Sequence, residues 1–493
     1  MDNVITTKRT IKDILKVSLS NVLKLLAGVL VGFLLPKIIG VTDYGYFKTF
    51  TLYSSYIGLL HFGFADGIYL LYGGKNYEEL ERSSFRLFTF FLILLELIIA
   101  VAGGFVALLL LEGELKFLFI CLAFYLLSAN ITNYYQIISQ VTSRFNELSL
   151  RTVIQSILTC IAVVALWITY KLDGNLLSYR IYTIIFVAIS IILTLWYIYT
   201  YRDITFGKKQ PYSEGKKTLF SFFKIGFPLL FANLCSTFIL TIDRQFVNIL
   251  FETDTYAVYA FAYNMLALIT TALAAISTVL YPTLKRTNKE TLKNNYVFLI
   301  RMILIMVFAC LSVYFPLKWF VPWFLPKYID SLPIFRIILP GLAVSSAISI
   351  VMHNYYKTEG KELMFFVKSI IILVLSGIAN LVAYSIFKTT LSISIASIIV
   401  MVVWYAIIEE YFIREYKIKW IKNFAYMVLM SAGFYFITMW NNWWVTLLIY
   451  IGFFVVVTCL FYWNDINLAF NKFLKRRRKM VMDGNNQNSG DKQ

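Results

Sequence analysis

The chain has 493 residues, of which 59% are hydrophobic and only 15% are charged. This composition excludes a water-soluble globular protein, because a soluble domain of this length could not bury so much apolar surface. The formal net charge of +18 could suggest a nucleic-acid partner. We exclude nucleic acid, since the cations are spread over the gaps between apolar segments and follow a membrane topology.

About fourteen apolar segments follow one another along the chain. Each is long enough to cross a hydrocarbon core of about 30 Å as a helix. In chain order they are 15–39, 46–72, 85–111, 117–138, 153–170, 176–199, 219–250, 256–284, 296–316, 333–353, 364–387, 391–411, 424–439 and 444–463. The sequence therefore predicts an all-α polytopic membrane protein.

Lys and Arg residues concentrate in every second gap between the predicted spans. Most of the 45 Lys and Arg residues lie in these gaps or in the terminal segments, and few lie in the alternate gaps. The positive-inside rule assigns the basic gaps to the cytoplasm. We therefore expect both termini to be cytoplasmic, with a basic, partly disordered tail that faces anionic membrane lipids.

The first and seventh spans begin alike, which indicates an internal repeat. Residues 14–18 resemble residues 222–226, and each segment leads into a long span, a short turn and a tyrosine-rich helix start. Parallel repeats of this kind are a transporter architecture. The predicted divisions are a cytoplasmic N-terminus (1–14), a six-helix bundle (15–200), a cytoplasmic linker (201–218), a second six-helix bundle (219–411), two additional helices (412–463) and the tail (464–493).

The chain offers few groups for catalysis. It has no phosphate-binding Gly-Lys-Ser/Thr loop and no paired cysteine motif, and its two histidines, His61 and His353, lie near opposite ends of different spans. We therefore expect no enzymatic activity, no catalytic residues, no metal site and no cofactor. A membrane-embedded glycan polymerase or ligase stays open as an alternative, since such enzymes need only a few polar residues at the membrane surface.

Ionisable residues inside spans are candidates for function, because each is costly in a bilayer. Lys24 and Asp66 lie at similar depth on consecutive spans, where they could form a structural ion pair or a cavity-facing pair that separates on substrate or ion binding. Glu96 lies near the middle of the third span. It is a candidate for proton or cation coupling, and a hydrogen bond to a neighbouring helix is the alternative.

Further charges lie in later spans. Asp243 and Arg244 are adjacent and point about 100° apart on a helix, so we expect Arg244 to face a central path and Asp243 to meet another helix. Arg180, Arg301 and Lys368 lie near span ends, where long side chains can also reach the interface. Together these cations would favour an anionic head group.

Five segments carry a family resemblance: the first-hairpin turn 35–47, Phe-Gly-Phe-Ala-Asp-Gly at 62–67, Gly-Phe-Pro at 226–228, Thr-Ile-Asp-Arg at 241–244 and Tyr-Ala-Val-Tyr at 256–259. With these motifs the chain resembles the oligosaccharide flippases of polysaccharide biosynthesis. That family belongs to the multidrug/oligosaccharidyl-lipid/polysaccharide exporter (MOP) superfamily.

The resemblance implies a flippase in the bacterial cell membrane that moves polyprenyl-diphosphate-linked oligosaccharide to the outer leaflet by alternating access. By position, Lys24 and Arg244 would line a cationic cavity, with Asp66 beside Lys24. An H⁺ or Na⁺ gradient, or downstream polymerisation, could drive transport, and the protein could associate with a polymerase or glycosyltransferases.

Two features distinguish this chain from parts of the superfamily. A small-molecule or drug exporter is the main rival, and the extra pair of predicted helices argues against it. The predicted eighth span (256–284) lacks a cation, which argues against the lipid II flippase branch. No Arg follows soon after Asp66, which leaves a basic lining from the second span in doubt.

Overall fold

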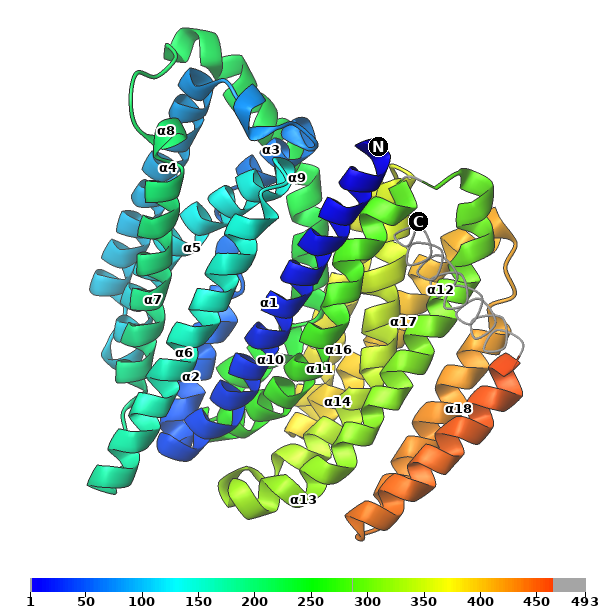
Figure 1. The fold of residues 1–493 in the computed structure, drawn as a ribbon. Helices are drawn as coiled ribbons and strands as arrows, with labels where there is room; N and C mark the ends of the chain where they lie inside the picture. Colours follow the sequence, from blue (N-terminus) through cyan, green and yellow to red (C-terminus); the bar gives the residue numbers. More distant parts are fainter. Residues whose placement is uncertain (1, 286, 464–493) are drawn as a thin grey trace, which may run out of the picture.

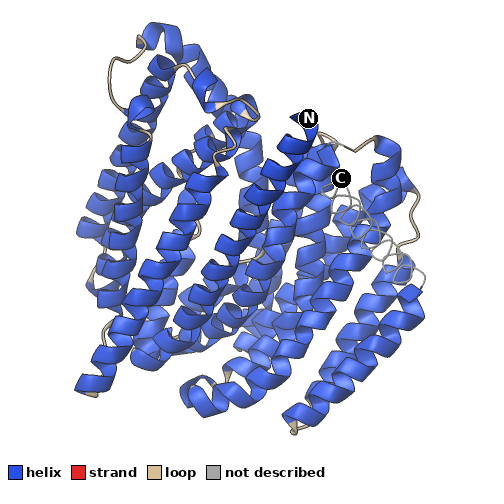
Figure 2. Ribbon diagram, in the orientation of Figure 1, coloured by secondary structure: helices blue, strands red, loops and turns tan. Residues whose placement is uncertain are grey.

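The computed structural model describes residues 2–285 and 287–463, and the predicted tail 464–493 lies outside them. Within these residues every regular element is a helix (Figure 2). A single isolated bridge joins Ile39 to Leu177. This is the expected outcome for spans in lipid, because a helix satisfies its own backbone hydrogen bonds. The predicted all-α polytopic class is confirmed.

The first half of the chain forms the N-terminal bundle (Figure 1). Its helices are α1 (Asp2–Ile38), α2 (Val41–Ser54), η1 (Ile57–Leu59), α3 (Phe64–Tyr72), η2 (Tyr77–Glu79), α4 (Arg82–Leu110), α5 (Gly113–Val141), α6 (Phe145–Asp173), α7 (Tyr179–Thr200) and α8 (Arg202–Thr205). We refer to the side on which α1 begins as the amino-terminal side.

The second half forms the C-terminal bundle and two appended helices. Its helices are α9 (Tyr212–Ile239), α10 (Ile242–Leu250), α11 (Thr253–Lys285), α12 (Lys289–Cys310), η3 (Leu311–Val313), α13 (Tyr314–Phe324), η4 (Pro326–Tyr328), α14 (Ser331–Ser346), the π-helix η5 (Ala347–Met352), α15 (His353–Thr358), α16 (Glu362–Phe387), α17 (Thr390–Tyr416), α18 (Ile421–Thr438) and a last helix, Trp443–Trp463.

Eleven helical segments in the described part of the chain are long and apolar enough to cross a membrane, judged by length and composition. They coincide with eleven of the predicted spans. The other three predicted spans correspond to the interrupted path α2–η1–α3, to α11 and to α18. The strict criterion therefore finds fewer spans than the sequence predicted, and the helices occupy the predicted segments in the predicted order.

Two of the membrane-spanning segments are interrupted. The second of them, which we call the second path (α2, η1 and α3), unwinds between α2 and α3, where Phe62 has a φ of 50° and Gly63 a φ of 82°. Such left-handed angles are costly for a bulky residue and easy for glycine. The predicted seventh span breaks at Leu240 and Thr241, between α9 and α10. Broken spanning helices are typical of transporter sites, because unwound backbone needs polar partners inside the protein.

Helix α9 belongs to the cores of both bundles. Its first half begins inside the predicted linker and packs into the N-terminal bundle, where the Phe222 ring lies 4.9 Å from that of Phe88. Beyond Pro228, the Phe231 ring lies 5.9 Å from Phe366 on α16 of the C-terminal bundle. A linker boundary at residue 218 was therefore placed too late, since the apolar contacts begin before it.

The appended helices pack beside the C-terminal bundle. In the last helix the Tyr450 hydroxyl donates to the Phe308 carbonyl at 2.6 Å, and from α18 the Tyr435 hydroxyl donates to the Ile337 carbonyl at 2.8 Å. These phenols satisfy carbonyls of α12 and α14 that lie within the membrane region. Figure 1 shows α18 at the edge of the molecule, on the far side from α4 and α7.

Candidate functional site

Arg180 makes a structural contact at the end of α7. Its Nη2 lies 2.7 Å from Glu114 Oε1 and its Nε donates to Glu114 Oε2 at 3.1 Å. The Tyr179 hydroxyl also donates to Glu114. This two-pronged pair is the geometry that a guanidinium prefers with a carboxylate. The structure therefore places Arg180 at an outer corner of the N-terminal bundle, away from the centre.

Arg301 and Lys368 also have partners away from the centre. The Arg301 Nε donates to Asn423 Oδ1 at 3.4 Å, which connects α12 to α18. The Lys368 Nζ donates to the Ile407 carbonyl at 2.7 Å and lies 3.5 Å from Glu410 Oε2, which connects α16 to α17. Both cations join neighbouring helices, so the prediction that they line the cavity is not supported by their positions.

Lys24 is exposed on the face of α1 that meets α11. Gly28 and Gly32 continue this face at intervals of one turn, and a Cβ on Gly28 would lie 3.8 Å from Leu268 of α11. No ion pair joins Lys24 to Asp66 among the described residues, because α1 packs on α6 and α11 whereas α3 packs on α9 and α5. The Lys24–Asp66 ion pair is not formed, and the role of Lys24 in a cationic cavity stays a prediction.

Arg244 lies at the centre, as expected. Its Nη2 donates to the Leu240 carbonyl at 3.2 Å, and its guanidinium lies 4.7 Å from the centre of the Tyr263 ring. Its buried Nε has no hydrogen-bond acceptor among the described residues. The guanidinium therefore keeps unused donor capacity, which is uncommon for a half-buried arginine.

A cavity of about 370 Å³ opens beside Arg244. Its walls come from α9, α10, α11, α14, η5 and α17, so it lies within the C-terminal bundle. Most of the lining is aliphatic, and hydroxyl groups of Thr270, Ser345 and Ser349 add polar positions. This volume lies in the range of small-molecule sites, which commonly combine apolar walls with a few polar groups.

Asp243 points away from Arg244, toward α11. Its side chain is 1% exposed and accepts hydrogen bonds from the hydroxyls of Tyr259, at 2.7 Å, and Tyr263. Its Oδ1 has no partner among the described residues. The Tyr259 hydroxyl also accepts from Ser394 on α17 at 3.4 Å. A buried carboxylate oxygen without a donor is costly, so this position is a candidate for binding a cation or proton.

Lys48 is a central cation that the sequence interpretation missed. Lys48 lies at the very edge of the predicted span 46–72, so its charge was counted with the adjacent outer gap. In the structure it lies seven residues inside α2, about 10 Å from the helix start at a rise of ~1.5 Å per residue. Its Nζ donates to Asn264 Oδ1 at 3.1 Å, and it lies close enough to Arg244 for electrostatic repulsion. The depth of Lys48 beyond Val41 was the signal that could have identified it.

A polar seam joins the two bundles on the side opposite the amino-terminal side. Thr49 accepts from Asn248 Nδ2 at 2.6 Å, and Tyr53 accepts from Gln245 Nε2 at 2.9 Å. One turn further along, Tyr56 and Thr241 share a hydrogen bond of 2.9 Å. We call these three contacts between α2 and the α9–α10 segment the seam. It holds Lys48 and Arg244 at the interface between the bundles.

The seam is closed tightly where α2 meets α11. A Cβ on Gly45 would lie 2.5 Å from the Thr253 carbonyl oxygen, so only glycine permits this approach. The Tyr256 hydroxyl donates to the Lys48 carbonyl at 3.3 Å. These contacts bring the helix starts of both bundles together on one side of the molecule.

Glu96 is completely buried in α4, with an exposure of 0%. The Asn130 Nδ2 donates to Glu96 Oε2 at 2.8 Å and to the Ile57 carbonyl at 3.2 Å. The Glu96 carboxyl group therefore orients the Asn130 side-chain amide. That amide also donates to a backbone carbonyl of η1, in the interrupted second span. The alternative to coupling was a hydrogen bond to a Ser, Thr or Tyr of a neighbouring helix; the partner in the structure is an asparagine of α5, and the coupling role stays a prediction.

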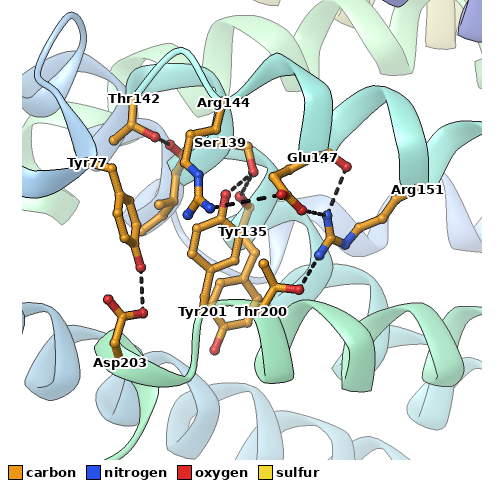
Figure 3. Close-up of polar contacts among 11 residues, drawn as sticks. Tyr77, Tyr135, Ser139, Thr142, Arg144, Glu147, Arg151, Thr200, Tyr201 and Asp203 are labelled. Carbon is orange, nitrogen blue, oxygen red and sulfur yellow. Dashed lines mark hydrogen bonds and ion pairs between the residues drawn. The ribbon is translucent and has the colours of Figure 1, made fainter.

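Arg151 is the centre of a polar cluster at the amino-terminal side of the N-terminal bundle (Figure 3). Its side chain is 2% exposed, and its Nη1 lies 2.6 Å from Glu147 Oε2. Its Nη2 donates to the Thr200 hydroxyl, and its guanidinium lies 4.1 Å from the centre of the Tyr197 ring. Through Thr200 and Tyr197 the Arg151 side chain joins α6 to α7, and its buried Nε has no acceptor among the described residues.

Arg144 extends this cluster to the loop after α3. Its guanidinium lies 4.4 Å from the Tyr77 ring centre and 5.0 Å from that of Tyr201. The Tyr77 hydroxyl donates to Asp203 Oδ1 at 2.7 Å (Figure 3). Burial and the Asp203 carboxylate raise the pKa of Tyr77 above its usual range. Both arginines of the cluster pair with Glu147, and the cluster stabilises the helix ends around it.

No group of three or more His, Cys, Asp or Glu side chains that could hold a metal occurs in residues 2–285 and 287–463.

Comparison with known proteins identifies one protein family and several solved structures with a similar fold. A family profile described as "Polysaccharide biosynthesis protein" matches residues 10–288, more than half of the chain. None of the curated proteins matches the chain significantly.

Solved structures share the fold. The lipid II flippase MurJ in an inward closed conformation is 15% identical with a TM-score of 0.70, and the match covers 92% of this chain and 100% of that chain. An inward-facing multidrug resistance MATE family transporter of the MOP superfamily is 15% identical, with a TM-score of 0.56 and coverage of 81% and 97%. A MOP superfamily transporter from Pyrococcus furiosus is 14% identical, with a TM-score of 0.56 and coverage of 83% and 97%.

Proposed function

Because the chain belongs to the polysaccharide biosynthesis protein family, we propose that it is a flippase for polyprenyl-diphosphate-linked oligosaccharides. The MOP-superfamily fold supports transport by alternating access of two bundles. The amino-terminal side is cytoplasmic in this proposal, and the substrate moves from there to the outer leaflet of the cell membrane. The head group crosses between the bundles while the polyprenyl chain stays in lipid.

The observation that carries the proposal is a pair of central cations without a carboxylate partner. Lys48 from the N-terminal bundle bonds to Asn264, and Arg244 from the C-terminal bundle stacks on Tyr263, the preceding residue of α11, so the two positive charges lie near enough for electrostatic repulsion. Within the described residues no ion pair joins either one to Asp or Glu. A diphosphate would relieve this repulsion and fill the unused donors of both groups, since Arg and Lys both bind phosphate well.

The cavity beside Arg244 supports a sugar-bearing head group. Its hydroxyls from Thr270, Ser345 and Ser349 can exchange hydrogen bonds with sugar hydroxyls, and its aliphatic walls suit the apolar faces of a pyranose ring. At about 370 Å³ it would hold only the units next to the diphosphate. The remaining sugars would extend into the cleft, toward exposed Lys24.

Coupling to H⁺ or Na⁺ at Asp243 fits this arrangement. The carboxylate is next to Arg244 in sequence and shares Tyr263 with it, because that ring stacks on the guanidinium while its hydroxyl bonds to the acid. A cation or proton at the free Oδ1 would alter the field at Arg244. Uncompensated cations at the interface disfavour the rival function, export of cationic drugs.

The test is substitution of Arg244 or Lys48 by Gln in the full-length protein. Each change removes a charged phosphate contact of about 1.5–3 kcal/mol, so binding of a polyprenyl-diphosphate glycan should weaken about 10- to 100-fold. Flipping of the same fluorescent glycolipid in proteoliposomes should fall in parallel. Binding to detergent-solubilised protein and quenching of outer-leaflet label measure the two effects.

Arg180→Gln is the matched control, because it removes a cation from a membrane-end pair with Glu114 far from the centre. Its binding and flipping should stay near those of the unaltered protein. Unchanged glycolipid binding in both Arg244→Gln and Lys48→Gln would refute the diphosphate site. Transport of a cationic dye in place of the glycolipid would favour the drug-exporter rival.

A further inference from the structure

An arginine of α14 lacks a partner on the side opposite the amino-terminal side. Arg336 is half-buried, and it forms no hydrogen bond and no ion pair with any described residue. Its Nε is buried from solvent as well. A guanidinium carries five N–H donors, and leaving them unused inside a protein is costly. An acceptor that the described residues do not supply would satisfy this side chain.

Arg336 does not face the cavity beside Arg244. Ile338 lines that cavity and follows Arg336 by two residues, which is a rotation of about 200° around a helix. On the opposite face of α14, the charge of Arg336 interacts with Tyr314 of α13 and with Tyr435 of α18. An anion bound there would be separate from a substrate in the cavity.

Contacts between three helices fix the surroundings of Arg336. The Tyr435 hydroxyl donates to the carbonyl of Ile337, the next residue of α14, at 2.8 Å. The ring of Tyr314 lies 5.9 Å from that of Phe335, the preceding residue of α14. Arg336 is therefore held where α13, α14 and α18 meet.

A second cation lies at the same junction. Lys318 follows Tyr314 by about one turn of α13. Its Nζ donates to the carbonyls of Thr438, at 3.0 Å, and Trp440, at 2.7 Å, where α18 ends. An ammonium has three N–H donors, so one donor of Lys318 remains free. Its positive charge and that of Arg336 repel each other.

No acid on the surrounding helices balances these two charges. Helices α13, α14 and α18 and the last helix contain no Asp or Glu, and α12 carries Glu290 in its first turn, at the far end from α13. Asp330, just before α14, is exposed. Among the described residues no carboxylate forms an ion pair with Lys318 or Arg336. An anion from another molecule would compensate them.

Tryptophans place this junction at the membrane interface. Trp319 follows Lys318, is 50% exposed, and its ring centre lies 5.8 Å from those of Trp323 and Trp443. Exposed tryptophans gather at the level of the lipid head groups. Figure 1 shows α13 and the end of α18 on the side opposite the amino-terminal side. The anion present at this depth in a membrane is the phosphate of a lipid head group.

We propose that Arg336 and Lys318 form a binding site for the phosphate of a phospholipid in the leaflet opposite the amino-terminal side. Arg336 donates to the phosphodiester oxygens from α14, and the free donor of Lys318 adds a contact from α13. The acyl chains stay in the bilayer. The bound lipid fills the junction between the C-terminal bundle and the appended helix α18. This site is separate from Arg244 and Lys48 and does not depend on the proposed function.

The experiment measures binding of phosphatidylglycerol to the purified full-length protein by native mass spectrometry. We expect one tightly retained lipid, and Arg336→Gln should weaken its binding about 10-fold or more, because a charged contact is lost. Arg336→Lys keeps the charge and should retain most of the binding. Arg180→Gln is the matched control and should have no effect, since Arg180 is an arginine at a helix end that already pairs with Glu114.

Photocrosslinking locates the lipid in the unaltered protein, so this measurement does not depend on how a variant folds. A phosphatidylglycerol analogue with a diazirine close to its glycerol backbone should label residues 314–324 and 435–443 in preference to other segments. Glycerol 1-phosphate, which has the phosphate without acyl chains, should compete only weakly with this labelling.

Three outcomes would overturn the proposal. Equal phosphatidylglycerol binding by the parent and Arg336→Gln would show that the arginine holds no lipid, and labelling spread evenly over the lipid-facing helices would show non-specific contact. Strong competition by glycerol 1-phosphate would show an anion site without a lipid. If Arg336→Gln weakened binding of the polyprenyl-diphosphate glycan and not of phosphatidylglycerol, the site would belong to the transport path instead.

Discussion

Cations that looked equivalent in the sequence have different environments in the structure. Arg180 and Lys368 meet carboxylates within their own bundle, whereas Arg244 keeps a buried Nε without an acceptor. Lys48, assigned to a gap, bonds to the neutral Asn264 inside the membrane region. A paired cation stabilises a helix contact, and an unpaired one at an interface remains available to an anion.

Variants of Glu96 and Asn130 test whether the buried Glu96 carboxyl group couples transport to an ion or only stabilises the fold. Glu96→Gln keeps an oxygen acceptor for Asn130, so we expect glycolipid flipping within about twofold of the parent and an unchanged dependence on the ion gradient. Asn130→Leu leaves the Ile57 carbonyl and Glu96 without their donor, which should cost about 1–3 kcal/mol and lower the thermal midpoint. Vesicle flipping assays and thermal unfolding in detergent measure both. Loss of gradient dependence in Glu96→Gln would instead establish a coupling role.

Breaks in two helices arrange the candidate site. The unwound segment after α2 holds His61, Asp66 follows in the first turn of α3, and the break before α10 places Asp243 and Arg244 in a first helical turn. Glycine contacts then hold α3 against α9, because Gly63 and Gly226 approach each other too closely for any side chain. Short helices joined by such breaks direct polar side chains inward at mid-membrane depth.

Gly226→Ala tests the packing of α3 on α9. The added methyl group would meet the Gly63 carbonyl oxygen at 1.9 Å, so backbone must move and the fold should lose about 1–3 kcal/mol. The measurement is the thermal midpoint of the purified protein, which should fall by several degrees. Gly103→Ala on α4, where a Cβ meets nothing within 4 Å, is the matched control and should be neutral or slightly stabilising. Equal midpoints for the two variants would contradict the close packing.

The molecule as a whole is closed on one side by contacts between bundles. The seam and the Gly45–Thr253 approach connect α2 to α10 and α11 on the side opposite the amino-terminal side. On the amino-terminal side the first half of α9 packs into the N-terminal core. Because α9 is shared by both cores, relative movement of the bundles must change its packing.

A reversible crosslink across the seam tests whether the bundles separate there during transport. Thr49→Cys with Asn248→Cys places two thiols at positions that share a 2.6 Å hydrogen bond, and the cysteines are joined by oxidation or by a short, reducible thiol-reactive crosslinker. We expect the crosslink to lower the rate of glycolipid flipping at least tenfold, and a reductant to restore that rate. Flipping in proteoliposomes before and after reduction is the measurement.

The matched control places the same chemistry inside one bundle. Ser128 and Ser190 share a hydrogen bond of 2.8 Å between α5 and α7, so their double cysteine variant should oxidise as readily. Its flipping should be unaffected, because these helices move as a unit. Full activity of the oxidised Thr49–Asn248 crosslink would show that the seam stays closed throughout the cycle.

Sequence alone was sufficient for the helical membrane class and the order of the spans, because apolar length and charge alternation are local properties of the chain. The superfamily was identified by the resemblance of five short motifs to a known family. Sequence also predicted that Arg244 and Asp243 point to different partners, since the helical rotation between adjacent residues is known. It could not pair Lys48 with Asn264. That contact depends on how the two bundles meet, and partners about 200 positions apart in the chain leave no periodic signal.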